Sequence, residues 1–327
     1  MTRLCQFGAG RIGQIHAANV AGAGASLAYV VDVNAEAAAA LAARHGARVA
    51  DAETALSDPS VDAVIIASST DTHADLIERA ARVRKPIFCE KPVDLSMERV
   101  ERCVAAVRAA GVPVLMGFNR RFDPSFAQLR RGIEAGVIGK VELVQITSRD
   151  PSPPPPEYVR VSGGLFRDMM IHDLDMARFL LGEEPEQVFA TASCLVDPRI
   201  AAAGDVDTAL VTLRTASGRL CQISNSRRAS YGYDQRIEVH GELGMLQAGN
   251  RVGTTVVAST AQGVVADKPL HFFLERYAEA YRAELAHFLD VAAGRATPLV
   301  GIEDGRRALQ LAEAANESLR LGRAVKA

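Results

Sequence analysis

The stretch "RLCQFGAGRIG", residues 3 to 13, decides the fold. A short apolar run leads directly into a G-x-G-x-x-G pattern, and helical periodicity begins inside that pattern and continues to about residue 22. The glycines allow a tight turn and a close backbone approach, so a pyrophosphate would meet free N–H groups at the positive end of the helix. The stretch therefore predicts the opening strand–turn–helix unit of a dinucleotide-binding domain. The cofactor contacts expected from it are Gly8, Gly10, Arg11, Ile12 and Gly13.

The residues that follow, up to about 118, alternate short apolar runs with helical patterns, which is typical of a doubly wound parallel sheet. Asp32 ends the second run, 19 positions after Gly13. A carboxylate there can accept hydrogen bonds from the adenosine ribose hydroxyls and would repel a 2′-phosphate. The pattern therefore favours NAD over NADP.

Two further strand ends are expected at the carboxyl edge of this sheet, where ligands bind in such folds. "ASSTDTH", residues 67 to 73, offers Ser68, Ser69, Thr70 and His73 as cofactor contacts, although Asp71 and Thr72 could instead cap the next helix. "CEKP", residues 89 to 92, places Glu90 and Lys91 at the next strand end. Because the proline imposes an extended backbone on the lysine, Lys91 should point toward the cofactor crevice; the alternative is a solvated charge.

The sequence pattern changes at about residue 140, where apolar runs follow one another with turn residues and few helices between them. This predicts an α+β domain with a large, mostly antiparallel open sheet. We expect a Rossmann domain over residues 1–119 and a substrate-binding and oligomerisation domain over 120–327. Helices are expected at 273–293 and 302–321, and the last can pack back on the first domain. A sheet face left uncovered would pair with another subunit.

Polar residues interrupt an apolar helical pattern in "FRDMMIHDLDMARFL", residues 166 to 180. At 3.6 residues per turn, Asp168, His172 and Asp175 share one face, while Asp173 points elsewhere. An aspartate one turn from a histidine can orient the imidazole and raise its basicity, which predicts a general base. The alternative is a surface pair worth a few tenths of a kcal/mol.

Composition limits the partners. Lys and Arg total 37 against 39 Asp and Glu, a net charge of −2, so no basic surface for nucleic acid or an anionic membrane is expected. No window of 18 consecutive apolar residues occurs. Five scattered cysteines without metal-ligand spacing indicate reduced thiols in a cytoplasmic protein, and no metal is expected.

Together, GAGRIG, EKP and "GGLFRDMMIHDLDMARFL" resemble the glucose–fructose oxidoreductase and inositol dehydrogenase family over essentially the whole chain. "GFNRRFDPSF" (117–126), "SRDPSPPPPEYV" (148–159) and "NSRRASYGYDQR" (225–236) resemble its inositol dehydrogenase branch. The resemblance implies a catalytic set of Lys91, Asp168 and His172 and a homotetramer. It also implies that "PSPPPP", otherwise a stiff connector, shapes the site entrance. The implied substrate contacts are Lys91, Asn119, Arg120, Asp150, Asp168, His172, Asp175 and Tyr231.

The resemblance further implies NAD-dependent oxidation of the polyol myo-inositol to 2-keto-myo-inositol, a step of inositol catabolism. Asn119 departs from the methionine often found at that position in the branch, which leaves the preferred stereoisomer open. The alternatives are a dehydrogenase of scyllo-inositol, chiro-inositol or an aldose on the same scaffold, and a non-catalytic NAD-binding regulator. Glucose–fructose oxidoreductase chemistry with bound NADP is disfavoured by Asp32.

Overall fold

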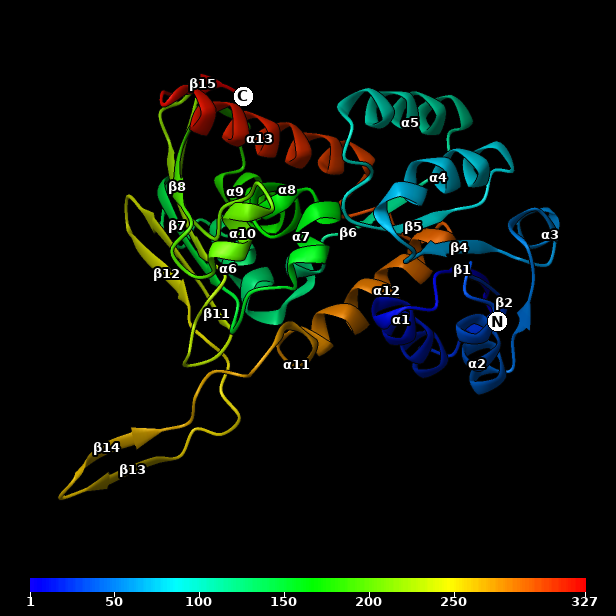
Figure 1. Cartoon of the computed structure of the whole chain (residues 1–327), viewed down its shortest axis with the longest axis horizontal. Coiled ribbons are helices and arrows are strands. Elements are labelled where there is room, and N and C mark those ends of the chain that lie inside the picture. The colour runs from blue at the N-terminus through cyan, green and yellow to red at the C-terminus, as the bar shows by residue number, and fades with distance from the viewer. The chain divides into compact units, whose positions relative to one another are not determined.

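The computed structural model describes residues 1–327, which form two compact units (Figure 1). The first comprises residues 1–122 and 280–309, and the second comprises 123–279 and 310–327. The division therefore differs from the 1–119 and 120–327 expected from the sequence. Most of α12 (Ala278–Ala292) belongs to the first unit, where Phe288 packs edge-on against Phe88 with ring centroids 5.7 Å apart. Chain order alone does not reveal this long-range packing.

The first unit contains the predicted parallel sheet, with strand order β3-β2-β1-β4-β5-β6. The strands are β1 Arg3–Phe7, β2 Ser26–Val31, β3 Arg48–Val49, β4 Ala63–Ile66, β5 Ile87–Glu90 and β6 Val114–Gly117. The connecting helices are α1 Arg11–Gly22, α2 Ala35–His45, α3 Ala52–Ser57, α4 His73–Arg82 and α5 Met97–Ala110. Every side chain of β4 is buried, as expected for a strand covered on both faces.

The second unit contains the predicted open sheet, with order β12-β11-β7-β10-β9-β8-β15. Its strands are β7 Val141–Arg149, β8 Pro185–Ser193, β9 Thr208–Thr215, β10 Leu220–Ser226, β11 Asp234–Gly241, β12 Gly244–Ala248 and β15 Val325–Lys326. All neighbours pair antiparallel except β7 and β10, so the mostly antiparallel expectation is confirmed. The helices are α6 Pro124–Glu134, α7 Pro156–Ser162, α8 Gly164–Asp168, α9 Ile171–Leu181, α10 Pro198–Ala202 and α11 Phe273–Arg276.

The polar segment at 166–180 forms two helices instead of the single helix that its periodicity predicts. Helix α8 ends at Asp168 and α9 begins at Ile171, with Met169 and Met170 between them. Both methionines are buried. Asp168 and His172 therefore belong to two successive helices and not to one continuous helix.

One hairpin was not expected from the sequence. Strands β13 (Val257–Thr260) and β14 (Gly263–Ala266) pair only with each other and project from the second unit as an arm (Figure 1). Residues 252–268 are exposed throughout, and 252–266 contain no charged residue. The absence of a buried face explains why alternation did not predict it.

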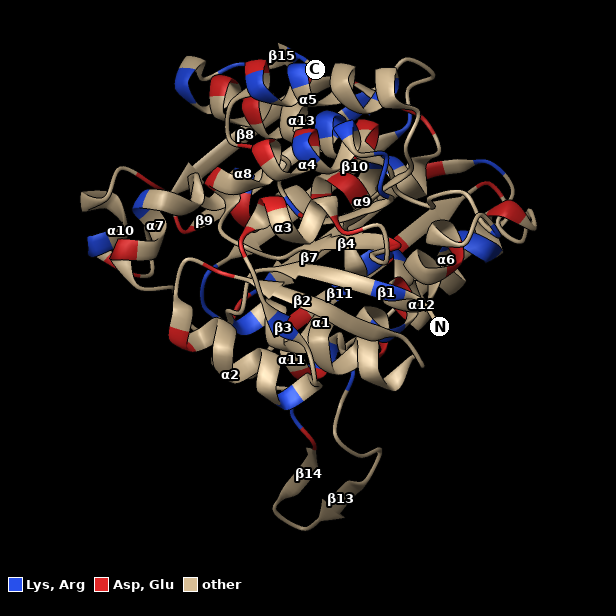
Figure 2. Cartoon of the chain, turned by 90° about the vertical axis from the view of Figure 1, so that its right-hand side faces the viewer, with Lys and Arg blue, Asp and Glu red and all other residues tan.

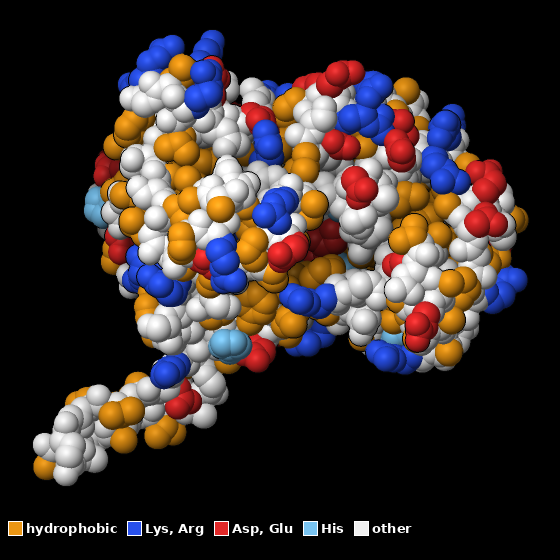
Figure 3. Space-filling model, viewed as in Figure 1, with side chains coloured by type: hydrophobic (Ala, Val, Ile, Leu, Met, Phe, Trp, Pro, Cys, Tyr) orange, Lys and Arg blue, Asp and Glu red, His pale blue; other side chains and the backbone are white.

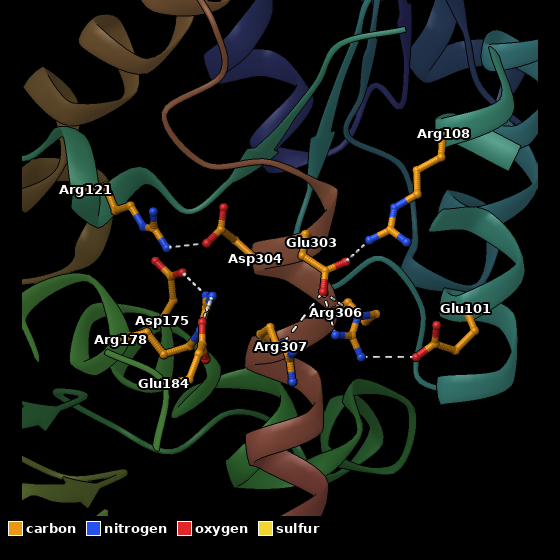
Figure 4. A network of polar contacts seen from close by, with 10 residues as sticks. All are labelled: Glu101, Arg108, Arg121, Asp175, Arg178, Glu184, Glu303, Asp304, Arg306 and Arg307. Atoms are coloured by element: carbon orange, nitrogen blue, oxygen red, sulfur yellow. Dashed lines mark hydrogen bonds and ion pairs between the residues drawn. The ribbon is translucent and has the colours of Figure 1, made fainter. Parts of the chain in front are cut away.

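Helix α13 (Ile302–Leu321) contributes its first residues, up to Leu309, to the first unit. Glu303 receives hydrogen bonds from Arg108 and Arg306, and Arg306 also reaches Glu101 at 3.2 Å (Figure 4). A Cβ at Gly305 would lie 2.9 Å from a methyl of Val93, so only glycine permits this close packing.

Charged residues of both signs are interspersed along the elements visible in Figure 2, as the near-zero net charge predicts. None of the helices combines the length and the apolar character that crossing a bilayer requires.

Candidate active site

The predicted cofactor and substrate residues of the first unit follow strands of its parallel sheet. The glycine-rich turn follows β1, Asp32 follows β2, Ser68 follows β4, Lys91 follows β5 and Asn119 follows β6. Since all these strands are parallel, their carboxyl ends lie at one edge of the sheet. The fold thus brings together residues that are up to 111 positions apart in the sequence.

The three glycines of the turn are required for different reasons. Gly8 has φ of +101°, and a Cβ on it would lie 2.3 Å from the carbonyl oxygen of Ala67. A Cβ on Gly13 would lie 2.2 Å from the carbonyl oxygen of Gly8. Gly10 has an ordinary φ of −70°, and no protein atom lies within 4 Å of its Cβ position. Neither backbone strain nor a neighbour demands glycine at Gly10, whereas close approach by a pyrophosphate would, so the turn fits a dinucleotide.

Asp32 is held beside this turn by backbone donors. Ala9 N–H donates to its Oδ2 at 2.6 Å, and Asn34 N–H donates to its Oδ1 at 2.8 Å. Buried Gln6 reinforces the turn from below, because its Nε2 donates to the carbonyl oxygens of Gly8 and Gly13, both at 2.8 Å. The carboxylate therefore has a fixed position from which to accept ribose hydroxyls. The role of Gln6 was not predicted from the sequence.

The loop after β4 is organised by its own side chains. Ser68 and Thr72 hydroxyls lie 2.6 Å apart, and Ser69 and Thr70 begin the short 3-10 turn Thr70–Thr72. His73 is buried; its Nδ1 lies 2.7 Å from the carbonyl oxygen of Pro92, and its Nε2 lies 3.2 Å from that of Ser68. Burial lowers the pKa of His73, so it remains neutral. His73 thus connects the loop after β4 to the loop at Pro92, and its contact with the cofactor stays a prediction.

Two buried ionisable residues, His16 and Glu284, interact with Glu90, the residue before Lys91. His16 of α1 places its Nε2 2.7 Å from Glu90 Oε1, and its ring packs against Phe88. Glu284 of α12 is fully buried, and neither of its carboxyl oxygens has a hydrogen-bond partner in the protein. Burial, followed by the charge of Glu90, raises the pKa of Glu284 well above its usual value. Burial therefore favours the protonated, neutral form of Glu284.

Glu284→Gln is expected to stabilise the protein increasingly as the pH rises. The raised pKa means that the native state binds a proton more tightly than the unfolded chain, whose glutamate has a pKa near 4.3. The contribution of this group is thus complete below about pH 4.3 and declines toward the native pKa, by up to about 1.4 kcal/mol per pH unit. Glutamine mimics the protonated acid and does not titrate.

Thermal unfolding followed from about pH 5 to pH 9 measures this effect. The melting temperature of the variant should exceed that of the wild type by a margin that grows with pH. Glu36→Gln, at an exposed position on α2, is the control and should show no such trend. A pH-independent difference for Glu284→Gln would show that this carboxyl titrates normally.

The segment after β6 carries the remaining predicted residues of the first unit. Asn119 and Arg120 lie in the 3-10 turn Asn119–Phe122 and are both buried. The next residue, Arg121, donates to the carbonyl oxygen of Leu299 at 3.1 Å and to Asp304 at 2.9 Å. Arg121 therefore joins the turn to the start of α13 (Figure 4).

The second unit gathers its own polar residues at one end of its sheet. Strand β7 ends opposite Ser226 of β10 and opposite Asp234 at the start of β11. Asp150 follows β7, and its N–H donates to the carbonyl oxygen of Ser226 at 3.0 Å. Tyr231, in the loop before β11, donates to buried Asp234 at 2.6 Å and accepts a hydrogen bond from Arg149 at 3.0 Å. Asp150 and Tyr231 are therefore held at the same end of the sheet.

Asp168, the last residue of α8, contacts the side chains of Tyr158 and Arg227. Tyr158 of α7 donates to its Oδ1 at 2.9 Å, and Nη2 of Arg227 lies 3.4 Å from its Oδ2. The same guanidinium reaches toward Asp150, with Nη1 3.8 Å from Oδ2. Burial, followed by the charge of Asp168, raises the pKa of the Tyr158 phenol, so this hydroxyl remains a donor.

Helix α9 carries His172 at a partly exposed position in its first turn. Asp173 is buried and accepts a hydrogen bond from Asn225 of β10 at 2.9 Å, which fixes the helix to the sheet. Asp175 is also buried and lies 3.5 Å from Arg178, which pairs in turn with Glu184 (Figure 4). Among the polar residues of this helix, Asp173 therefore has a structural role.

The sequence interpretation missed Arg227, Tyr158 and Asn225. A signal exists for two of them, because alternate residues of β10 and its extension are buried, at Cys221, Ile223, Asn225 and Arg227. An asparagine and an arginine on the buried face of a strand require polar partners. No comparable pattern identifies Tyr158, since its contact depends on how α7 and α8 pack.

Two sequence profiles of known families match the chain. Residues 3–118 match "Oxidoreductase family, NAD-binding Rossmann fold", and residues 126–247 match "GFO/IDH/MocA C-terminal domain". The chain is 51% identical over 319 residues to an inositol 2-dehydrogenase of Rhizobium meliloti (strain 1021), covering 97% of this chain and 96% of the relative. It is 47% identical to a myo-inositol 2-dehydrogenase of Thermotoga maritima, covering 99% and 98%. A scyllo-inositol 2-dehydrogenase (NAD(+)) of Bacillus subtilis (strain 168) is 38% identical, covering 99% and 96%.

Solved structures show the same similarity over the full length. A myo-inositol dehydrogenase from Corynebacterium glutamicum superposes with a TM-score of 0.95 at 44% identity, covering 100% of this chain and 98% of that one. A myo-inositol dehydrogenase from Lactobacillus casei in complex with NAD(H) and myo-inositol superposes with a TM-score of 0.90 at 27% identity, covering 100% and 97%.

Proposed function

The chain belongs to the GFO/IDH/MocA family of oxidoreductases, and from this premise we propose that it oxidises myo-inositol to 2-keto-myo-inositol with NAD as the acceptor. One observation carries the proposal. A chain that aligns from end to end with inositol 2-dehydrogenases has Lys91 at the ligand-binding edge of its Rossmann sheet and Asp168 and His172 at the α8–α9 junction. A protein that only bound the cofactor would need none of these three residues.

NAD is the cofactor of the first unit. The turn at Gly8–Gly13 provides the N–H groups for its pyrophosphate, and Asp32 accepts the ribose hydroxyls, which excludes the 2′-phosphate of NADP by charge. The residues proposed beside it are Arg11, Ile12, Ser68, Ser69, Thr70, Glu90 and Lys91. When bound, NAD accepts the hydride from the carbinol carbon.

We assign the proton transfer to His172. It accepts the proton of the substrate hydroxyl as the C–O bond becomes a carbonyl, and Asp168 stabilises the imidazolium that forms. Lys91 donates a hydrogen bond to the same oxygen and stabilises the negative charge that develops on it. The products are the ketone, NADH and one proton, so the reaction balances without another oxidant.

The remaining substrate hydroxyls are assigned to polar side chains, because a polyol is recognised mainly by hydrogen bonds. A substrate that lacks a hydroxyl leaves a buried partner unpaired, and this discriminates strongly between similar sugars. The proposed contacts are Asn119, Arg120, Asp150, Asp175 and Tyr231, in addition to the catalytic residues. Asn119, Arg120 and Asp175 are buried, and Asp175 also pairs with Arg178.

A substrate panel tests this proposal. NADH formation is measured with myo-inositol, scyllo-inositol, chiro-inositol and glucose at equal concentration, with NAD in excess. The highest kcat/KM should belong to myo-inositol. A clear preference for scyllo-inositol, the substrate named for the Bacillus subtilis relative, would keep the reaction and replace the substrate. No turnover of any polyol by protein that binds NAD would favour a cofactor-binding regulator.

We further propose that the enzyme is a homotetramer in the cytoplasm. One face of the seven-stranded sheet exposes Phe189, Leu210, Leu220 and Met245, whereas α9 packs against the other face. The β13–β14 arm exposes valines at 256, 257, 264 and 265 (Figure 3). Exposed apolar side chains gathered on one sheet face are characteristic of subunit interfaces. The five cysteines form no disulfide, which supports a reducing compartment.

Phe189→Asp combined with Leu210→Asp is expected to dissociate the tetramer, because each charge would be buried without a partner at the interface. Sedimentation equilibrium measures the molecular mass. The wild type should sediment as four chains and the variant as fewer. Glu134→Gln, at an exposed position of α6 outside this sheet face, is the control and should leave the mass unchanged. A monomeric wild type would refute the interface.

A further inference from the structure

The guanidinium of Arg227 lies between two carboxylates of the proposed site. Its Nη2 lies 3.4 Å from Asp168 Oδ2, and its Nη1 lies 3.8 Å from Asp150 Oδ2. The side chain of Arg227 is only 2% exposed, and its Nε has no hydrogen-bond partner in the protein. Arg227 is thus a buried cation and not a solvated surface charge. Its terminal nitrogens face two carboxylates.

The backbone at Arg227 is fixed by a buried aspartate. Its N–H donates to the carbonyl oxygen of Asp207 at 2.9 Å. The Asp207 carboxylate in turn accepts the N–H groups of Leu195, Val196 and Asp197, at 2.8 to 3.0 Å. The backbone of Arg227 is therefore rigidly held. A side chain on a rigid backbone can keep a neighbouring carboxylate in one position.

Tyr158 contacts the second carboxylate oxygen of Asp168, whereas Arg227 lies beside Oδ2. Its hydroxyl donates to Oδ1 at 2.9 Å, from a helix that begins at Pro156, the last residue of the proline-rich segment. Helices α7 and α8 lie side by side (Figure 1), so the prolines fix the start of the helix that carries this tyrosine. Both oxygens of Asp168 are thereby oriented, one by a neutral donor and one by a cation.

We propose that Arg227 is a positioning residue that holds Asp168 in its catalytic orientation and neutralises the repulsion between Asp168 and Asp150, with Tyr158 fixing the second oxygen of Asp168. Two carboxylates near one substrate repel each other, and a buried cation shared by both removes that repulsion. The inference rests on the proposed function, because it assigns to Asp168 the stabilisation of the protonated base.

Arg227→Met is expected to lower kcat for myo-inositol about thirtyfold, because Asp168 loses its orientation and with it part of the contribution of the base. Arg227→Lys retains the charge without the two-pronged geometry and should recover kcat to within about fivefold of the wild type. NADH affinity, measured by fluorescence, should be unchanged in both variants. Arg228→Met is the matched control: this neighbouring arginine is exposed and should tolerate the change.

A double-mutant cycle with Asp168→Asn separates positioning from a merely structural ion pair. In the Asp168→Asn background, Arg227→Met should lower kcat by less than about twofold further, since its effect acts through Asp168. Thermal unfolding of each variant measures the folded fraction to which kcat refers. Multiplicative losses in the double variant, or full activity of the folded Arg227→Met enzyme, would overturn the inference.

The cycle also distinguishes this inference from the proposed function. Full activity of Asp168→Asn would contradict the catalytic assignment itself and the inference with it. If Asp168→Asn lowers kcat, and Arg227→Met lowers kcat by the same factor with and without Asp168→Asn, only the inference is contradicted. If another polyol proves to be the better substrate, the same cycle is read with that polyol and the same outcomes decide.

Discussion

His172→Ala is expected to lower kcat for myo-inositol by about a thousandfold, because a positioned general base contributes about 10²- to 10⁴-fold to such a proton transfer. The cofactor is held by the first unit, to which His172 does not belong, so NADH affinity should stay within about twofold of the wild type. Turnover is measured by the absorbance of NADH, and affinity by its fluorescence. Loss of turnover with retained cofactor binding is the signature of a missing base.

The pH profile provides a second test of this residue. In the wild type, kcat/KM should fall toward acid pH as the imidazole becomes protonated and can no longer accept the hydroxyl proton. This acid limb should be absent from the residual activity of His172→Ala. His271→Ala, at an exposed position in the same unit, is the matched control. Unchanged turnover of His172→Ala would remove this residue from the mechanism.

Asp32→Ala is expected to narrow the preference for NAD over NADP, as a ratio of kcat/KM values, by about a hundredfold. Hydrogen bonds from ribose hydroxyls to a charged acceptor contribute about 1.5 to 3 kcal/mol each, and their loss weakens NAD. Removal of the carboxylate also relieves the repulsion of a 2′-phosphate, which strengthens NADP. Both changes lower the ratio of kcat/KM with NAD to kcat/KM with NADP.

The contact between Asp32 and Ala9 N–H complicates the alanine variant, because the glycine-rich turn also loses an acceptor. Asp32→Asn retains an oxygen for that N–H while removing the charge, so it should narrow the ratio with a smaller loss of NAD affinity. Asp51→Ala removes an exposed helix cap in the same unit and should leave the ratio unchanged. An unchanged ratio in both Asp32 variants would refute the selecting role.

Much of the fold could be predicted because its signals are local. The glycine pattern after an apolar run, and Asp32 at the next strand end, define a βαβ unit without reference to the rest of the chain. The succession of apolar runs separated by turn residues from about residue 140 likewise predicts the second sheet. The break between α8 and α9 could not be predicted, since buried Met169 and Met170 have good helix propensity and tertiary packing overrides it.

The site was only partly predictable for a similar reason. Lys91, Asp168 and His172 lie in motifs, and strand order explains why Lys91 lies at the edge that holds Asp32. His73 matched the expected loop, but its burial and its contacts with backbone oxygens depend on the loop at Pro92. The roles of Arg227 and Glu284 depend on the residues that surround them. Those residues belong to segments distant in sequence, so no local pattern reveals them.

Transfer of the hydrogen from C2 of myo-inositol to the cofactor tests the central claim most directly. The enzyme is supplied with NAD and with myo-inositol that carries deuterium only at C2, and the NADH formed is analysed by mass spectrometry. We predict one deuterium per NADH and a slower turnover than with unlabelled substrate if hydride transfer limits the rate. NADH without deuterium would show that another carbon is oxidised and would contradict the assignment.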